Sequence, residues 1–298
     1  MEGSPSFFAN AKARRGSEGF EEAKRRLIEL GMSSNQCTGF LDARELENAV
    51  REAADEGAER VIVGAGDGTI SALAKYFVHS KTKLGIIPLG TGNQIARDLK
   101  IPENIPLACE IALGDLSSPI DVGVIRDDFF LNVVTIGLSS QIAQELTSQQ
   151  KRTFGKFAYI RALLKAFAIL KSFEIELSIE GDKRVFRAVQ VVIGSGRTHA
   201  GPFPVAPLAS IIDGKLNIYA VGGVSKWTLL KVAMLMPFGK QVELKEVEAF
   251  EATQCELSTR PPMRITVDGE PSGRTPIRVS ILKGAINAIV SSDFIASN

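Results

Sequence analysis

The 298-residue sequence has few cysteines, almost no net charge and no long apolar run. Its three cysteines, Cys37, Cys109 and Cys255, lie too far apart to indicate a disulfide framework or a zinc site. The formal net charge of +1 argues against a dedicated nucleic-acid-binding protein, since such proteins carry a basic excess that faces the phosphates. These absences predict a cytoplasmic, reducing location and no nucleic-acid partner.

The sequence also lacks signals for export or membrane insertion. Its first residues, MEGSPSFFANAKARR, contain no basic segment followed by a long apolar core, so we expect no signal peptide. Every apolar stretch is too short or too charged to span a bilayer, which predicts a protein without a transmembrane segment. The length is sufficient for two domains, and there is no internal repeat or low-complexity linker.

Two glycine-bearing loops are the most informative feature of the sequence. The apolar runs at 60–63 and 84–87 predict short parallel strands buried on both faces, and they lead into the loops GAGDGT (64–69) and PLGTGN (88–93). Ligands of open α/β sheets bind at the carboxyl ends of the strands, where both loops are expected. Because glycines let a phosphate approach the backbone, the loops predict a phosphate site in which Asp67 can hold a phosphate-bound magnesium.

Other interpretations of these loops are weaker. A single loop of this kind is often only a tight strand-to-helix turn, but two of them at neighbouring strand ends favour a binding site. A P-loop is excluded because no Gly-Lys-Ser/Thr follows either loop. The dinucleotide fingerprint GxGxxG also fails, because Thr69 occupies the position of its third glycine.

The pattern of predicted elements changes near residue 121. Before it, helical periodicity at 18–31, 42–57 and about 70–79 alternates with strands, which predicts a parallel sheet with helices on its faces. After it, the sequence is mostly strand-like, at 129–137, 173–180, 184–193, 215–221, 241–251, 263–267 and 277–282.

The expected fold class is therefore α/β + β. An N-terminal α/β domain with a parallel sheet should span 1–121 together with the apolar tail 285–298. A C-terminal antiparallel β-sandwich should span 122–284.

Several motifs resemble those of one family. GAGDGT is similar to the Gly-Gly-Asp-Gly-Thr signature of the diacylglycerol kinase catalytic superfamily, which includes sphingosine and ceramide kinases and soluble bacterial lipid kinases. PLGTGNQIARDLKIP resembles its second signature, and NAKARRG resembles its opening Asn-Pro-x-x-Gly loop. IDVGVIRDDFFLNVVTIGL, GPFPVAPLASIIDGKL and ITVDGEP resemble segments of its second domain, so the likeness spans nearly the whole chain. The first loop alone is shared with NAD kinases.

The resemblance implies a nucleotide-binding first domain that uses ATP as phosphoryl donor with Mg²⁺. Asp67 would help to hold the catalytic magnesium, and Glu270, in the late Asp-Gly-Glu motif, would be the general base. The alternative for Glu270 is a simple hairpin turn at Asp-Gly, which is compatible with the catalytic role. The residues implied to bind the nucleotide are Asn10, Thr38, Val63, Gly64, Ala65, Gly66, Asp67, Gly68, Thr69, Thr91 and Asn93.

A second metal site is implied near IIDGKL. Asp213, with the carbonyls of Ser210 and Lys215, matches a structural magnesium site of bacterial members, and hard oxygen ligands on a tight loop suit that ion. An ordinary Asp-Gly turn is the alternative. Asp121 stands at the family's crossover Asp, which implies a partner for a basic residue or metal-bound water, or else a strand-end cap.

These features predict a lipid kinase that phosphorylates a hydroxyl of diacylglycerol or a related lipid, working from the cytoplasm at the membrane surface. Two alternatives stay open: a soluble-metabolite kinase of the NAD kinase type, and a non-catalytic lipid-binding or regulatory protein. Ala65 and Gln94, which replace the family's usual Gly and Asp, favour the last. Basic amphipathic segments at 154–173 and 226–240 predict helices that either lie in the membrane interface or cover the sandwich. Exposed sandwich edges could pair in a homodimer.

Overall fold

The computed structural model describes residues 4–13, 15–137, 172–196, 198–200, 203–204, 210–222 and 244–297. Contacts divide the chain into two compact units. Unit 1 comprises Met1–Val122, Ile211–Gly214 and Leu282–Asn298, and unit 2 comprises Gly123–Ser210 and Lys215–Ile281. The amphipathic segment predicted at 226–240 lies outside the described residues, as does all of 154–173 except its last two residues.

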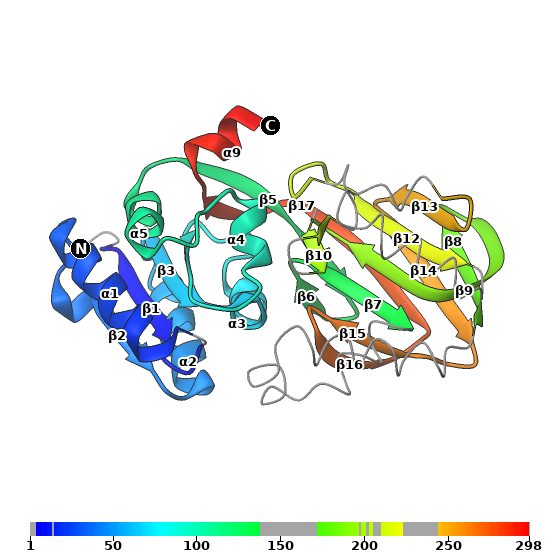
Figure 1. Cartoon of the computed structure of the whole chain (residues 1–298), viewed down its shortest axis with the longest axis horizontal. Helices are drawn as coiled ribbons and strands as arrows, with labels where there is room; N and C mark the ends of the chain where they lie inside the picture. The colour runs from blue at the N-terminus through cyan, green and yellow to red at the C-terminus, as the bar shows by residue number, and fades with distance from the viewer. Residues whose placement is uncertain are drawn as a thin grey trace. The chain divides into compact units, whose positions relative to one another are not determined.

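Unit 1 contains a parallel sheet with helices around it (Figure 1). The strands β1–β4 run parallel in the order β2-β1-β3-β4, and the end of β17 (Ile277–Ile289) pairs parallel with β4 through Ala288 and Leu84. Every residue of β3 is buried, as predicted for a parallel strand covered on both faces. The elements of this unit are β1 (Ser6–Asn10), α1 (Gly16–Glu29), η1 (Ser34–Gln36), β2 (Cys37–Phe40), α2 (Ala43–Asp55), β3 (Arg60–Ala65), α3 (Asp67–Leu73), η2 (Ala74–Tyr76), β4 (Lys83–Pro88), α4 (Gln94–Asp98), α5 (Ile105–Leu113) and α9 (Ser292–Ser297).

The helices of unit 1 follow local signals in the sequence. Asp42 caps α2, because its carboxylate accepts main-chain N–H groups of the first turn at 2.8 and 3.3 Å. Gly57 follows the helix with φ +74°. The helix predicted from about residue 70 begins earlier, at Asp67, since the N–H of Ile70 already donates to the carbonyl of Gly66.

One face of the unit 1 sheet is covered by α1 and α5. These helices share a buried apolar cluster with β1, β3 and β4 that contains Phe7, Ala9, Ala23, Leu27, Ile62, Ile87, Leu89, Ile105 and Cys109. Helix α2 contacts β1, β2 and β3. The packing and the strand pairing hold the carboxyl ends of β1, β3 and β4 in a fixed register, so the loops that follow these strands begin at fixed positions.

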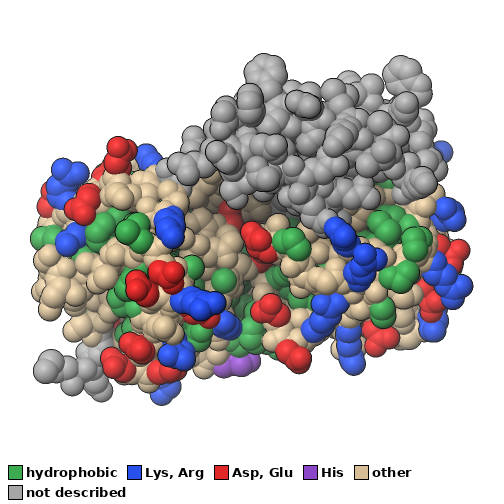
Figure 2. All heavy atoms as spheres, turned by 90° about the horizontal axis from the view of Figure 1, so that it is seen from below, with side chains coloured by type: hydrophobic (Ala, Val, Ile, Leu, Met, Phe, Trp, Pro, Cys, Tyr) green, Lys and Arg blue, Asp and Glu red, His purple; other side chains and the backbone are tan. Residues whose placement is uncertain are grey.

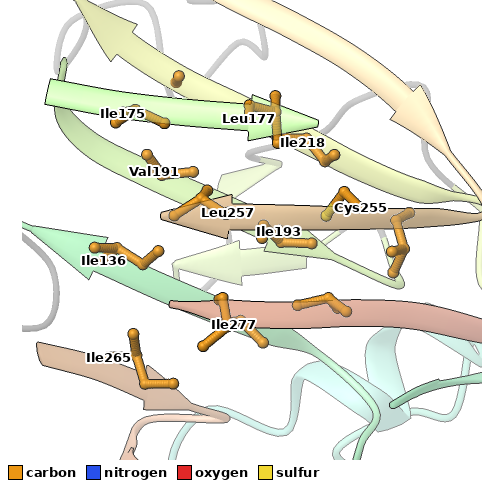
Figure 3. Close-up of a cluster of buried hydrophobic side chains, with 14 of the residues drawn as sticks. Ile136, Ile175, Leu177, Val191, Ile193, Ile218, Cys255, Leu257, Ile265 and Ile277 are labelled. Carbon is orange, nitrogen blue, oxygen red and sulfur yellow. The ribbon is translucent and has the colours of Figure 1, made fainter. Parts of the chain in front are cut away.

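Unit 2 is built from antiparallel strands. Strands β7, β8, β9, β12, β14 and β17 surround one apolar core, in which side chains such as Ile175, Val191 and Leu257 point into a shared interior (Figure 3). Together with the parallel sheet of unit 1, this confirms the predicted α/β + β fold class. The remaining elements are β5 (Ser117–Ile125), β6 (Asp128–Phe130), β7 (Val133–Gly137), β8 (Phe173–Ile179), β9 (Asp182–Gly194), β10 (Thr198–Ala200), β11 (Phe203–Pro204), β12 (Leu216–Gly222), β13 (Val247–Ala252), β14 (Gln254–Arg260), β15 (Arg264–Val267) and β16 (Glu270–Arg274).

Several strand predictions differ from the structure. The strand expected at 129–137 is two strands, β6 and β7, because Asp268 takes the N–H groups of residues 131 and 132 between them. The strand expected at 241–251 is β13, which begins at Val247. The strands that were not predicted are β5, β10, β11, β14 and β16. The strand expected to end at 282 continues to Ile289, so a single strand leads from unit 2 into unit 1.

The surface carries charges of both signs. Figure 2 shows acidic and basic side chains interspersed over the described part of the face that it draws, in keeping with the net charge of +1. Among the helices of the described ranges, none has the length and apolar character needed to cross a bilayer.

Candidate functional site

The two glycine loops meet at one edge of the unit 1 sheet. Strands β3 and β4 pair in parallel, with Ala65 opposite Pro88, so both loops leave the sheet at the same level. A Cβ placed on Gly90 would lie 2.5 Å from the Cα of Gly66 and 2.8 Å from the Oδ1 of Asn93. Only a residue without a side chain allows this approach of two main chains.

Asn93 closes the second loop. Its Oδ1 accepts the N–H of Gly90 at 2.9 Å and its Nδ2 donates to the carbonyl of Gly90 at 3.3 Å. The residue is 4 % exposed and has φ +50°, a left-handed conformation that asparagine tolerates better than most residues. Helix α4 begins directly after it, so the loop and the helix start are held by one side chain.

The carboxyl end of β1 joins the same edge. Asn10, the last residue of β1, donates its Nδ2 hydrogen to the Oγ1 of Thr69 at 3.1 Å. Its Oδ1 accepts the N–H of Lys12 at 3.0 Å. The amide therefore connects the opening loop to the start of α3, across 59 positions of sequence.

Asp67 is half-buried between the two loops. Its Oδ1 accepts the N–H of Ile95 at 3.0 Å, which ties α3 to α4. Burial raises the pKa of this carboxyl, although the N–H groups of Ile95, Gln94 and Asn93 act in the opposite sense. A Cβ on Gly92 would lie 2.7 Å from the Oδ2 of Asp67, so the glycine leaves free space beside that oxygen.

The other predicted nucleotide residues differ in their surroundings. Val63, Gly64 and Ala65 lie inside β3 and are buried, so the loop itself begins at Gly66. Gly68 and Thr91 are exposed on the loops. Thr38 is exposed on β2, paired with Phe8 of β1, two residues before the end of its strand. Side-chain hydrogen bonds of Asn10 and Asp67 thus join different segments at this edge, while those of Asn93 close the second loop on itself.

Glu270 is the exposed first residue of β16, in unit 2. It pairs with Val267 across a two-residue turn in which Asp268 and Gly269 have φ +47° and +88°. Positive φ at both central residues is the type I′ hairpin geometry that Asp-Gly favours, so the predicted turn is present. The turn is compatible with a catalytic role of Glu270 and does not by itself indicate one.

The carboxylate of Asp268 was not predicted to have a role. It accepts the N–H groups of Leu131, Asn132 and Val133 at 3.0, 3.0 and 2.7 Å. The partners are about 136 positions away in the sequence, and no local pattern links them.

Asp121 is the centre of a second carboxylate site, in unit 1. Its oxygens accept the N–H of Gly214 at 2.6 Å and the N–H of Gly284 at 2.8 Å, and the residue is 1 % exposed. Burial raises the pKa of Asp121, and the nearby charge of Asp213 raises it further. Asp213 itself lies in a turn that ends in Gly214 at φ +73°, so the Asp-Gly turn is present here too.

Comparisons with known proteins agree on both parts of the chain. Residues 6–125 match the model of a diacylglycerol kinase catalytic domain, and residues 132–290 match the model of the YegS C-terminal NAD kinase beta sandwich-like domain.

Individual relatives cover most of the chain. It is 27 % identical over 274 residues to a "Diacylglycerol kinase" of Staphylococcus haemolyticus, covering 90 % of this chain and 82 % of the relative. It is 30 % identical over 245 residues to a "Probable lipid kinase YegS-like" of Chromohalobacter salexigens, covering 79 % of this chain and 77 % of the relative. The crystal structure of a diacylglycerol kinase from Bacillus anthracis matches with a TM-score of 0.80 at 22 % identity, covering 97 % of this chain and 98 % of that one, which shows a shared fold.

Proposed function

Because the chain belongs to the diacylglycerol kinase family, which includes the YegS-like lipid kinases, we propose that it transfers the γ-phosphoryl group of ATP to a hydroxyl of diacylglycerol or a related lipid. The observation that carries this proposal is the contact of the two glycine loops, with the half-buried Asp67 between them, at the carboxyl ends of β3 and β4. The names of the relatives support a lipid as acceptor rather than a soluble metabolite.

The donor nucleotide would bind at the edge of the unit 1 sheet. Main-chain N–H groups of Gly66, Asp67 and Gly68 would face the phosphates, whereas that of Thr69 already donates to the carbonyl of Gly66 at 3.1 Å. The side chains of Asn10, Thr38, Thr69, Thr91 and Asn93 would line the pocket. The closeness of Gly66 and Gly90 supports this, because two main chains without side chains form a surface that phosphates can approach.

The residues at this edge fit a magnesium ion bound with the phosphates. Asp67 offers a carboxylate oxygen, and the missing side chain of Gly92 leaves space beside it. Magnesium is commonly held by one or two carboxylates together with substrate phosphates, so a single aspartate is sufficient. When bound, the ion would neutralise phosphate charge, and the protein's part is to keep the carboxylate of Asp67 in place through the N–H of Ile95.

We also propose a structural magnesium held by Asp213 with the carbonyls of Ser210 and Lys215. The supporting observation is that Asp213 lies near the buried Asp121, whose pKa is raised by burial and further by the charge of Asp213. A cation beside two such carboxylates would relieve their repulsion.

Glu270 would act as general base. A lipid hydroxyl is a poor nucleophile, and a carboxylate within hydrogen-bond distance can take its proton as phosphorus is attacked. The side chain is exposed at the start of a short strand, where a substrate can reach it. The acceptor would be met at the membrane surface, with the protein bound peripherally, and binding to anionic vesicles in a flotation assay would show this.

The test is transfer of labelled phosphate from ATP to a panel of lipids in mixed micelles. Glu270→Gln should lower kcat by about 10²- to 10⁴-fold, the usual contribution of general-base catalysis, while ATP binding stays unchanged. Glu248→Gln is a matched control, because it removes an exposed carboxylate from β13 of the same unit.

Three results would contradict parts of this proposal. Equal turnover of wild type and Glu270→Gln would remove the general-base role. Phosphorylation of NAD without any lipid would indicate the soluble-metabolite kinase. ATP binding in magnesium without transfer to any lipid would indicate a non-catalytic protein. The homodimer expected from exposed sandwich edges would appear in sedimentation equilibrium as twice the monomer mass, and a monomer mass would contradict it.

A further inference from the structure

We propose that Asp268 is a positioning residue for Glu270, and that it acts by anchoring the turn that carries Glu270 to the start of β7. This inference rests on the proposed function of Glu270 as general base. Its starting point is the carboxylate of Asp268, which accepts three consecutive main-chain N–H groups, those of Leu131, Asn132 and Val133, at 3.0, 3.0 and 2.7 Å.

The anchoring segment, residues 131–133, has no free main-chain polar group. Asp268 takes its three N–H groups, and the N–H of Asp268 donates back to the carbonyl of Val133 at 2.8 Å. Ser195, which is fully buried, takes the other two carbonyls: its Oγ donates to Leu131 at 2.8 Å and its N–H donates to Asn132 at 3.0 Å. Two residues thus satisfy all six groups, so the segment has one well-defined arrangement.

Strand β16 needs such an anchor. Among the strands that the structure describes, it lies at the edge of its sheet and pairs with β15 alone, and its residues are mostly exposed. Edge strands with exposed hydrogen bonds open locally at low cost. At its far end, Arg126 holds the strand by donating to the carbonyls of Ser272 and Arg274 at 2.9 and 2.7 Å. At the end that carries Glu270, the anchor is Asp268.

Position matters for the proposed chemistry. A general base must lie within hydrogen-bond distance of the proton that it takes, and an error of about 1 Å can cost about 100-fold in rate. Glu270 is two residues from Asp268, at the other side of a turn whose two central residues have fixed left-handed conformations. Loss of the anchor would therefore broaden the positions of Glu270 without removing its carboxylate.

The experiment is a double-mutant cycle in the lipid kinase assay. Asp268→Asn keeps the size of the side chain and its tolerance of positive φ, but it replaces one acceptor oxygen by an NH₂ group and removes the charge. We expect kcat to fall about 10- to 100-fold with the KM for ATP unchanged, in line with a misplaced base. In the Glu270→Gln background the same substitution should cause no further loss, because no base is left to misplace.

A second hairpin of unit 2 supplies the matched control. Glu180 and Gly181, between β8 and β9, have φ +51° and +88°, almost the same as Asp268 and Gly269. Glu180 is exposed, and Glu180→Gln should leave kcat unchanged. Hydrogen exchange gives a readout apart from activity: the amides of residues 131–133 and 270 should exchange at least tenfold faster in Asp268→Asn than in wild type.

The outcomes separate this inference from the proposed function. If Asp268→Asn lowers kcat by the same factor in both backgrounds, or leaves kcat and exchange unchanged, the positioning role is wrong while the kinase function stands. If Glu270→Gln is as active as wild type, the general-base role and this inference fall together. Should Asp268→Asn melt below the assay temperature, Ser195→Ala weakens the same segment more gently, and its loss of kcat must likewise vanish in the Glu270→Gln background.

Discussion

The contact between the two glycine loops leads to a quantitative prediction for Gly90→Ala. The new Cβ would lie 2.5 Å from the Cα of Gly66, whereas ordinary contact begins at 3.4 Å. Because the opposing atom belongs to the main chain, the two loops must separate by about 1 Å rather than let a side chain turn away. Overpacking of this kind costs about 1–3 kcal/mol, which lowers the melting midpoint of a domain of this size by several degrees.

The same displacement should affect function. The added methyl would also lie 2.8 Å from the Oδ1 of Asn93, so it would disturb the hydrogen bonds that close the second loop. If this edge positions the donor phosphates, a shift of about 1 Å should lower kcat/KM for ATP by about 100-fold. Differential scanning calorimetry and initial rates at varied ATP measure the two effects on the same preparation.

Gly68→Ala is the matched control for stability. It lies in the first loop, within α3, and a Cβ there would meet nothing within 4 Å. Alanine in a helix should raise stability by up to about 1 kcal/mol, while its methyl should still weaken ATP binding if the main chain of this loop faces phosphate. The reasoning is refuted if Gly90→Ala melts with wild type, or if Gly68→Ala is the more destabilised variant.

Three further predictions concern buried titratable groups. Burial raises the folded-state pKa of Asp67, so the ligand-free protein loses stability as pH rises through that pKa. Asp67→Asn should therefore raise the melting midpoint at pH 7 while it abolishes phosphoryl transfer. A lower melting midpoint would contradict the burial argument. Asp121→Ala should lower the free energy of unfolding by about 1–3 kcal/mol in urea titrations, because it leaves the buried N–H of Gly214 unpaired. An unchanged urea midpoint would show that water replaces the carboxylate. Burial raises the pKa of Cys109 and of Cys255 to about 12, so neither thiol should react with iodoacetamide at pH 8 until the chain is unfolded, as mass spectrometry of the labelled protein can check.

Local patterns in the sequence were sufficient for the fold class. The continuous apolar run before GAGDGT predicted a strand buried on both faces, and β3 is buried along its whole length. The strict alternation at 173–180 predicted a half-buried strand, and β8 alternates in burial over most of its length. The expected strand at 129–137 was wrong in one respect, since a distant aspartate interrupts it at residues 131 and 132.

The candidate site was only partly open to prediction. The family resemblance pointed to Asp67 and Glu270, and the predicted turn at Asp268 is present. The hydrogen bond between Asn10 and Thr69 joins residues whose separation in sequence carries no signal of contact. The catalytic and metal-binding roles stay predictions for the experiments above.

The sequence by itself determined the elements, the turns and the chemical groups available, because helix periodicity, strand alternation and Asp-Gly turns act over a few residues. Tertiary structure alone decided what each carboxylate does. Asp67 bonds to a helix start in the next βα unit, Asp121 joins two glycines from distant segments, and Asp268 anchors its turn to residues 131–133. The physical reason is that buried main-chain N–H groups must find an acceptor, and only the folded chain determines which side chain lies within reach.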